Sequence, residues 1–270
     1  MSIGDRRARF RALHAGEQLF VMPNPWDVGS ARLLESCGFE ALATTSAGFA
    51  WSIGKPDQGV ARDELVAHVA SLAVATSLPL NVDSERCYPD EPGGVARSVE
   101  LLAEAGAAGF SIEDYDPATG SIDAVEEAAA RVGIAAEAAH RLADPMVLTG
   151  RAENHIRGVH DLDDTIARLI AYRDAGADVL YAPGLSDLDQ IADVIEAVGV
   201  PLNVLALPHG PTVAELASIG VRRVSTGGTL ARSAYGALLA GAQELIADGT
   251  SSYAAGALPG EALEAAFGRR

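Results

Sequence analysis

Short apolar runs recur along the whole chain, and each is followed by a polar loop and then by a stretch with helical periodicity. Short runs of this kind predict buried strands, whereas apolar residues spaced three and four apart predict helices. The predicted strands cover residues 19–22, 41–45, part of 78–88, 109–112, 146–149, 179–182, 202–205 and 223–226. The predicted helices cover the start of the chain to residue 13, then 28–36, 62–75, 95–105, 122–142, 164–174, 187–198, 213–218, 229–247 and 261–267.

A glycine separates many of these helices from the next strand, as in Ser36-Cys-Gly-Phe, Glu104-Ala-Gly-Ala and Asp174-Ala-Gly-Ala. Glycine at this position adopts the left-handed conformation that ends a helix. Eight alternating units favour a closed (β/α)8 TIM barrel, and the lack of Gly-x-Gly-x-x-Gly after the first strand counts against a dinucleotide-binding sheet. We therefore expect one α/β-barrel domain over residues 1–270, with residues 251–270 forming a tail that contains a short helix.

Composition and charge narrow the classes of partner. The chain has 270 residues, 49% of them apolar, and carries a formal net charge of −17 with a pI near 4.6. A charge of this sign makes nucleic acid or an anionic membrane surface an unsuitable partner. Two cysteines do not suggest a disulfide framework, and no signal peptide or membrane-spanning run is recognisable, so we expect a reduced, cytoplasmic setting.

Charged side chains gather at the carboxyl ends of three predicted strands. Asp83 and Glu85 end the third strand, Glu113 ends the fourth, and Arg151 follows the fifth. In a (β/α)8 barrel these ends lie on one rim, where catalytic groups are found. Further rim candidates are Asp27, Ser46, Asp57, Glu153 and Asn203. The alternative is that these strand ends only meet solvent.

The types of group on this rim suggest a metal-assisted reaction. Carboxylates held close together repel one another unless a cation lies among them, and Mg²⁺ prefers oxygen ligands but takes few carboxylates directly. We expect Asp83 to be the direct ligand and Glu85 and Glu113 to act mainly through water, with Mn²⁺ as the alternative ion. Arg151 offers a planar fork for a carboxylate. A small 2-oxo acid would satisfy these groups together, and the metal would stabilise the enolate formed when a bond at C3 breaks.

Five motifs occur in order and at suitable spacing, namely Thr44-Thr-Ser-Ala-Gly, Gly54-Lys-Pro-Asp57, Asp83-Ser-Glu-Arg-Cys-Tyr88, Ser111-Ile-Glu-Asp114 and Gly150-Arg-Ala-Glu-Asn154. Together they resemble the isocitrate lyase/phosphoenolpyruvate mutase superfamily over residues 20–236. The resemblance implies an α/β barrel whose last helix is exchanged between subunits, usually in tetramers. It also implies Mg²⁺ and an enolate or enolpyruvate-like intermediate.

The resemblance also implies roles for individual residues. Asp83 matches the metal-ligand aspartate, while Glu85, Glu113 and Asp57 match acids that hold metal-bound waters. The candidate substrate-binding residues are Ser46, Ala47 and Gly48 of the oxo-acid loop, Asp83, the carboxylate-binding Arg151, and Asn203. The candidate catalytic residues are Ser46, Arg151 and Glu113.

The chain departs from the family where the substrate bond is broken. Residues 115–122 contain no Cys, Lys or His, although the lyase branch carries a catalytic cysteine loop there, and the Asn and Lys/Thr groups of the mutase and hydrolase branches are also missing. The segment from Asn203 to His209 replaces the family's Asn-x-Thr-Glu, which binds a second carboxylate. Cys87 stands where the family has a glycine, and we interpret it as a packed residue rather than a nucleophile.

The leading hypothesis is a Mg²⁺-dependent carbon–carbon lyase or decarboxylase that acts on a small 2-oxo acid of the pyruvate or oxaloacetate type. The alternatives are a phosphonopyruvate-type mutase or hydrolase and a non-catalytic barrel that only binds a 2-oxo acid. We expect a small-molecule substrate and a homo-oligomer, either a dimer or a tetramer, with neither nucleic acid nor membrane as a partner.

Overall fold

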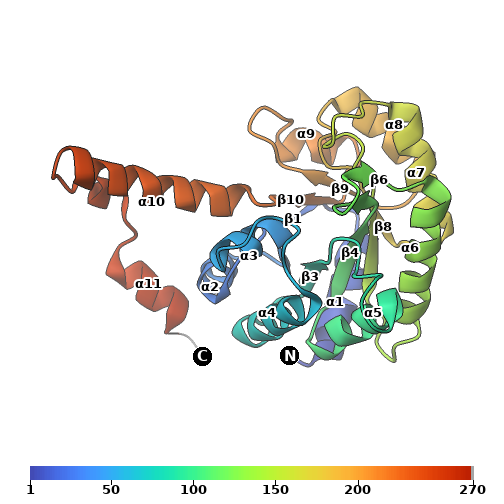
Figure 1. The fold of residues 1–270 in the computed structure, drawn as a ribbon, viewed down its shortest axis with the longest axis horizontal. Coiled ribbons are helices and arrows are strands. Elements are labelled where there is room, and N and C mark those ends of the chain that lie inside the picture. Colours follow the sequence, from blue (N-terminus) through green and yellow to red (C-terminus); the bar gives the residue numbers. More distant parts are fainter. Residues whose placement is uncertain (269–270) are drawn as a thin grey trace.

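The computed structural model describes residues 1–268 and shows eight parallel strands arranged as a barrel with helices around the outside (Figure 1). All eight predicted strands are present, each two to five residues long. The barrel strands are β1 (Phe20–Met22), β2 (Leu42–Ala43), β3 (Leu80–Asp83), β4 (Gly109–Glu113), β7 (Val147–Arg151), β8 (Val179–Tyr181), β9 (Leu202–Leu205) and β10 (Arg223–Ser225). A separate hairpin consists of β5 (Tyr115–Asp116) and β6 (Ser121–Ile122).

The helices follow the predicted order, with one addition. They are α1 (Ile3–Ala15), α2 (Val28–Ser36), α3 (Ser46–Ser52), α4 (Arg62–Ala75), α5 (Gly94–Glu104), α6 (Val125–His140), α7 (Leu162–Asp174), α8 (Leu188–Val198), α9 (Val213–Ser218), α10 (Thr229–Ala247) and α11 (Gly260–Phe267), with a 3₁₀ turn η1 at Ser252–Gly256. The predicted glycine joints have positive φ angles at Gly38, Gly106, Gly176, Gly199 and Gly220. Among residues 1–268, no helix is both long enough and apolar enough to cross a bilayer.

The strands pair in the order β1-β10-β9-β8-β7-β4-β3-β2. The longest pairing joins β4 to β7 over five residue pairs, from Gly109 with Val147 to Glu113 with Arg151. At the seam between the two end strands, Ala43 N–H donates to the Pro23 carbonyl at 3.1 Å. The sheet is therefore a nearly closed (β/α)8 barrel, as the alternation of strands and helices predicts.

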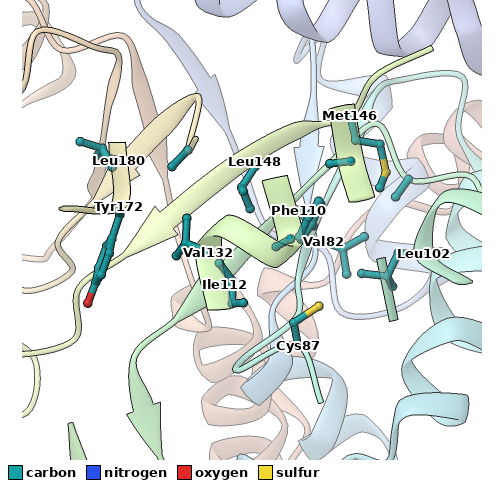
Figure 2. Packing of buried hydrophobic residues seen from close by; sticks show 14 of the residues in the cluster. Val82, Cys87, Leu102, Phe110, Ile112, Val132, Met146, Leu148, Tyr172 and Leu180 are labelled. Atoms are coloured by element: carbon teal, nitrogen blue, oxygen red, sulfur yellow. The ribbon is translucent and has the colours of Figure 1, made fainter. Parts of the chain in front are cut away.

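Alternate residues of each strand face opposite sides of the barrel wall. The outward residues pack against the helices, and Figure 2 shows Val82, Phe110 and Leu148 of the strands among Leu102 of α5 and Val132 of α6. The inward residues are mostly polar: Asn81, Asp83, Ser111, Glu113, Thr149, Arg151, Tyr181, Asn203, Arg223 and Ser225. A barrel interior is commonly filled by branched apolar side chains. This polar interior therefore indicates a binding region that reaches below the rim.

Helix α1 closes the amino-terminal end of the barrel. Phe10 and His14 are buried there, and a Cβ atom at Gly109 would lie 2.7 Å from Phe10 Cε1, so only glycine allows this close approach. Arg7 also ties the helix to the barrel, since its guanidinium donates to the carbonyls of Ala103 and Ala107 at 2.9 and 3.0 Å.

Two connections differ from the sequence-based expectation. Residues 46–52 form helix α3 instead of a loop, because Thr45 caps its first turn by accepting from Gly48 N–H. The expected helix over 122–142 begins only at Val125, and the hairpin β5–β6 precedes it. Asp116 stabilises the turn of that hairpin, since its carbonyl accepts from Gly120 N–H at 2.8 Å.

Helix α10 leaves the barrel instead of packing on it, and the chain returns through α11 toward α2 (Figure 1). Arg32 of α2 donates to the Phe267 carbonyl at 3.1 Å. Four large apolar side chains of α10, namely Leu238, Leu239, Leu245 and Ile246, are 48–88% exposed. The tail thus contains the predicted short helix, preceded by an apolar helix that stands largely in solvent.

Candidate functional site

Three of the predicted site residues lie side by side at the carboxyl ends of neighbouring strands. Asp83 ends β3, Glu113 ends β4 and Arg151 ends β7, and Glu113 is directly opposite Arg151 in register. The guanidinium lies between the two acids, with Nη1 3.3 Å from Glu113 Oε2 and 3.5 Å from Asp83 Oδ1. The parallel sheet therefore brings these residues together as their positions at strand ends predict.

Arg151 has a third carboxylate partner in Glu153. Its Nε donates to Glu153 Oε1 at 2.5 Å, and the fully buried Glu153 also accepts from Arg157 Nε at 3.1 Å. Burial by itself lowers the pKa of Arg151, but the charges of Glu153, Glu113 and Asp83 outweigh burial and raise the pKa well above its usual value. Nη2 of Arg151 has no hydrogen-bond partner within residues 1–268. A fixed positive charge with free donors therefore stands at this rim.

The loop at Ser46 is fixed against Asp83. Ser46 N–H and Oγ both donate to Asp83 Oδ2, at 3.0 and 2.9 Å. A Cβ atom at Gly48 would lie 2.6 Å from Thr45 Cγ2, so glycine is required for this turn. Because Gly48 N–H donates to Thr45 Oγ1, only Ala47 in the first turn of α3 has an N–H without an acceptor in the described chain.

Glu85 and Glu113 are carboxyl groups with too little positive charge around them. Glu85 is buried, and its Oε1 has no hydrogen-bond partner among the described residues. Burial, together with the charges of Asp83 and Asp57, raises the pKa of Glu85 to about 8. Burial also raises the pKa of Glu113 well above its usual value, although Arg151 opposes the shift. A cation among these groups would keep them ionised.

Asp57 and its neighbour Gln58 approach the acids from the loop after α3. Asp57 is exposed as a residue, but desolvation of its carboxyl group and the charge of Asp83 raise its pKa. Gln58, which sequence reasoning missed, donates from Nε2 to Glu113 Oε1 at 3.0 Å. Its φ angle of +63° is in the left-handed region, where glutamine is uncommon, so the sequence carries no signal for this placement.

The donor set is suitable for Mg²⁺, because it consists of carboxylate oxygens that only accept. Within residues 1–268, no three His, Cys, Asp or Glu side chains converge closely enough to hold one ion directly. This is compatible with the expectation that Asp83 is the single direct ligand and that water links Glu85, Glu113 and Asp57 to the ion. The orphaned Oε1 of Glu85 is the group that such a water would satisfy.

Asn203 is bonded to residues of β10 instead of to the acids at the rim. Asp83, Arg151 and Asn203 line one cavity of about 40 Å³ inside the barrel. Both ends of its amide are committed, since Oδ1 accepts from Arg223 Nε and Nδ2 donates to Ser225 Oγ, each at 2.9 Å. Arg223 and Ser225 were not recognised from the sequence, because a charged residue that begins a strand gives no sign of pointing inward.

Cys87 is fully buried, and burial raises the pKa of its thiol to about 12. Its φ angle is +60°, in the region that favours glycine, the residue that the resemblance implies for this place. A protonated and buried thiol is a poor nucleophile. The structure therefore supports the interpretation of Cys87 as a packed residue.

Comparison with protein families gives one match over most of the chain. A family model described as phosphoenolpyruvate phosphomutase matches residues 10–246. An uncharacterized protein of Mycobacterium tuberculosis is 37% identical over 221 residues, which cover 81% of each chain. A probable 2-methylisocitrate lyase of Corynebacterium glutamicum is 31% identical over 86% of this chain and 78% of its own length. An oxaloacetate decarboxylase of Paraburkholderia xenovorans is 33% identical over 81% of this chain and 74% of its own.

The fold also matches solved structures. A putative lyase/mutase from Burkholderia cenocepacia is 50% identical, with a TM-score of 0.94, and the match covers 99% of this chain and 97% of the other. The similarity therefore extends from the barrel through the C-terminal helices.

Proposed function

Because this chain belongs to the phosphoenolpyruvate mutase/isocitrate lyase superfamily, we propose that it is a Mg²⁺-dependent lyase or decarboxylase that acts on a small 2-oxo acid. The observation that carries this proposal is the pairing of under-neutralised acids with a fixed arginine on one rim. Glu85 and Glu113 have raised pKa values, and Arg151 stands beside them with free donors. A 2-oxo acid with a divalent cation would complement both parts.

In this proposal Asp83 binds Mg²⁺, or Mn²⁺ in its place, and Asp57, Glu85 and Glu113 hold the waters around the ion. The ion would supply Lewis-acid stabilisation of the negative charge that develops on the keto oxygen when the bond at C3 breaks. Glu113 forms an ion pair with Arg151. Its carboxyl group would hold or release a proton as negative charge develops on the substrate.

The remaining residues of the chain bind and orient the substrate. The free Nη2 of Arg151 would pair with the substrate carboxylate, because a guanidinium can keep its contact with Glu153 through Nε while a second face binds a ligand. Ser46, Ala47 and Gly48 would cover the carboxylate from the first turn of α3, with Ala47 N–H as the available donor. Asn203 would limit the depth to which the substrate enters.

The reaction class is supported by two relatives whose names describe cleavage of a carbon–carbon bond, a 2-methylisocitrate lyase and an oxaloacetate decarboxylase. A mutase or hydrolase of the phosphonopyruvate type remains an alternative through the family match. It is disfavoured because residues 115–122, which form the hairpin β5–β6, lack the polar groups of that branch.

Calorimetry with pyruvate, oxaloacetate and 2-oxoglutarate, with and without Mg²⁺, followed by product analysis, tests the proposal. We expect Mg²⁺-dependent binding of pyruvate and release of pyruvate from an oxaloacetate-like substrate above the rate with Mg²⁺ alone. Binding without turnover of any of these acids would favour a barrel that only binds a 2-oxo acid. Conversion of phosphonopyruvate would favour the hypothesis of a mutase or hydrolase.

We also propose that the protein is a homo-oligomer, a dimer or a tetramer, in which α10, the last helix of the barrel, is exchanged between subunits. The support is that α10 leaves its own barrel (Figure 1) and that its Leu238, Leu239 and Ile246 side chains are exposed. Apolar surface of this kind on a single helix is normally covered by another chain.

A further inference from the structure

Arg223 is a cation buried inside the barrel without a carboxylate partner. It is the first residue of β10 and is 2% exposed. Its guanidinium has three neutral partners: Asn203 Oδ1 at 2.9 Å, Thr149 Oγ1 at 3.0 Å and His14 Nε2 at 3.1 Å. Within residues 1–268, no carboxylate lies within ion-pairing distance of it.

His14 does not neutralise this charge. Its Nδ1 lies 2.8 Å from the Phe10 carbonyl oxygen, which can only accept, so Nδ1 carries the proton and Nε2 is the acceptor for Arg223. Burial and the adjacent guanidinium lower the pKa of His14 to about 3, so the ring is neutral at ordinary pH. The positive charge of Arg223 therefore remains uncompensated by the groups that bind it.

Two other arginines with little solvent exposure have negative partners, whereas the buried Arg7 donates to main-chain carbonyls alone. Arg131 bonds to Asp123, and Arg151 contacts Asp83, Glu113 and Glu153. A buried charge without a counter-charge is strongly unfavourable. A guanidinium has five N–H groups, and Arg223 uses three of them in the bonds described above. Two donors and one full charge are therefore left for another group.

A cavity is present where that group would bind. Arg223 and Arg151 both line the interior cavity of about 40 Å³. Asn81 lines it as well, and its amide makes no hydrogen bond to the described residues, with Oδ1 buried and unpartnered. A cavity volume of roughly 10–15 Å³ is already enough to hold one water molecule. The cavity is thus large enough for an anion of a few heavy atoms, and too small for a long acyl chain.

We propose that this cavity is an anion subsite, in which Arg223 and Asn81 bind one small anion below the rim, either a carboxylate group or an inorganic anion of similar size. Arg223 donates its two unused N–H groups to the anion, and Asn81 donates from its free amide. Helix α1 closes the floor of the subsite through His14. The subsite needs no metal, so its existence does not depend on the reaction proposed for the rim.

Thermal unfolding of the metal-free protein tests the subsite. The full-length protein is titrated with sodium formate in the presence of EDTA, at constant ionic strength set by gluconate, which is too large for the cavity. We expect a saturable rise in Tm for the parent protein. Arg223→Met should weaken the apparent affinity for formate by about tenfold or more, because it removes charge-assisted hydrogen bonds. Arg97→Met, a change in an exposed arginine of α5, is the control and should respond as the parent does.

A second variant keeps the test valid if Arg223→Met does not fold. Asn81→Leu has a similar shape and removes an amide that bonds to no described residue, so we expect a folded protein with weakened formate binding. Crystals soaked in bromide should show an anomalous peak beside the guanidinium of Arg223. No saturable response in the parent, an unchanged response in both variants, or no bromide in the cavity would overturn the proposal.

Competition then identifies the source of the anion. If formate weakens pyruvate binding in the presence of Mg²⁺, the subsite takes the carboxylate group of a bound organic acid. If formate and pyruvate bind together, it takes a separate anion from solution. Both results support the subsite. If the parent protein binds formate but does not bind pyruvate with Mg²⁺, the result counts against the proposed function and not against the subsite.

Discussion

Asp83 is the residue on which the proposed metal site depends most, because it contacts both the Ser46 loop and Arg151. We predict that Asp83→Ala abolishes Mg²⁺-dependent binding of pyruvate in calorimetry while circular dichroism stays unchanged, since the side chain lies at the rim and not in the apolar layer. Asp63→Ala, which removes an exposed acid from the first turn of α4, is the control and should bind as the parent does. Retention of Mg²⁺ and pyruvate binding in the Asp83 variant would show that the metal is held elsewhere.

Arg151 offers a second test at the scale of single residues. Arg151→Lys should weaken pyruvate binding at saturating Mg²⁺ by about 1.5–3 kcal/mol, or one to two decades, because lysine supplies a point charge instead of a fork. Arg151→Ala is less informative, since it leaves the buried Glu153 with Arg157 as its remaining partner in the described chain and is expected to lower stability. Arg157→Lys is the matched control and should bind pyruvate normally. Parent-like affinity in Arg151→Lys would mean that Arg151 acts only as a structural ion-pair partner.

The two cysteines should differ sharply in reactivity. Cys37 is exposed, whereas Cys87 is buried and its thiol has a pKa raised to about 12. We predict that iodoacetamide at pH 8 modifies Cys37 alone in the folded protein, because Cys87 is inaccessible and its raised pKa keeps the thiol protonated. Mass spectrometry of peptides measures the sites, and Cys37→Ser should leave the folded protein unmodified. Rapid labelling of Cys87 under these conditions would contradict its interpretation as a packed residue.

At the scale of elements, α1 and α4 each carry a buried neutral histidine that makes stability depend on pH. Burial lowers the pKa of His14 to about 3 and that of His68 to about 4. The unfolded chain takes up protons as the pH falls through about 6.5, and the folded chain does not, so the free energy of unfolding should fall by roughly 1.4 kcal/mol per histidine for each pH unit below that value. This contribution is fully present above pH 7 and is lost on acidification toward pH 4.

Urea unfolding at pH 7 and pH 5 measures this dependence. His14→Gln should change the difference in unfolding free energy between the two pH values by the share of one histidine, roughly 2 kcal/mol, while the share of His68 remains. Glu85 has the opposite effect, since its raised pKa favours the protonated folded form, and it is present in both proteins. An unchanged difference in the variant would show that His14 is not the group responsible.

The elements themselves could be predicted to different extents. The eight strands were recognisable because each is a short apolar run between a helical stretch and a rim residue, and register then brings Glu113 beside Arg151. Helix α3 was not recognised although Thr45 is a favourable capping residue, because seven residues are too few to show a helical period. The inward direction of Arg223 depends on packing between β10 and α1, which local sequence does not encode.

The path of α10 is a property of the whole molecule. Its residues have the same periodicity as a helix that packs on its own barrel, so the sequence alone does not distinguish the two arrangements. We predict that Leu238→Glu combined with Leu239→Glu dissociates the proposed oligomer, because both side chains are more than half exposed in one chain and would be buried between chains. Light scattering measures the mass, and circular dichroism should show an intact barrel.

The control for that experiment is Val74→Glu, which places a charge on an apolar residue of α4 that is 79% exposed. This variant should keep the mass of the parent. A parent that is already monomeric at micromolar concentration would contradict the exchange of helices directly.

Because α1 closes one end of the barrel, it determines the order in which ligands can bind and dissociate. Phe10 and His14 fill the amino-terminal end of the barrel, so the interior is open only at the carboxyl ends of the strands. A ligand must therefore enter and leave by the same opening, and a ligand bound at the bottom can dissociate only after one bound above it has left. A small anion beside Arg223 would therefore bind before the substrate and dissociate after it, because the substrate would occupy the part of the cavity next to Asp83 and Arg151.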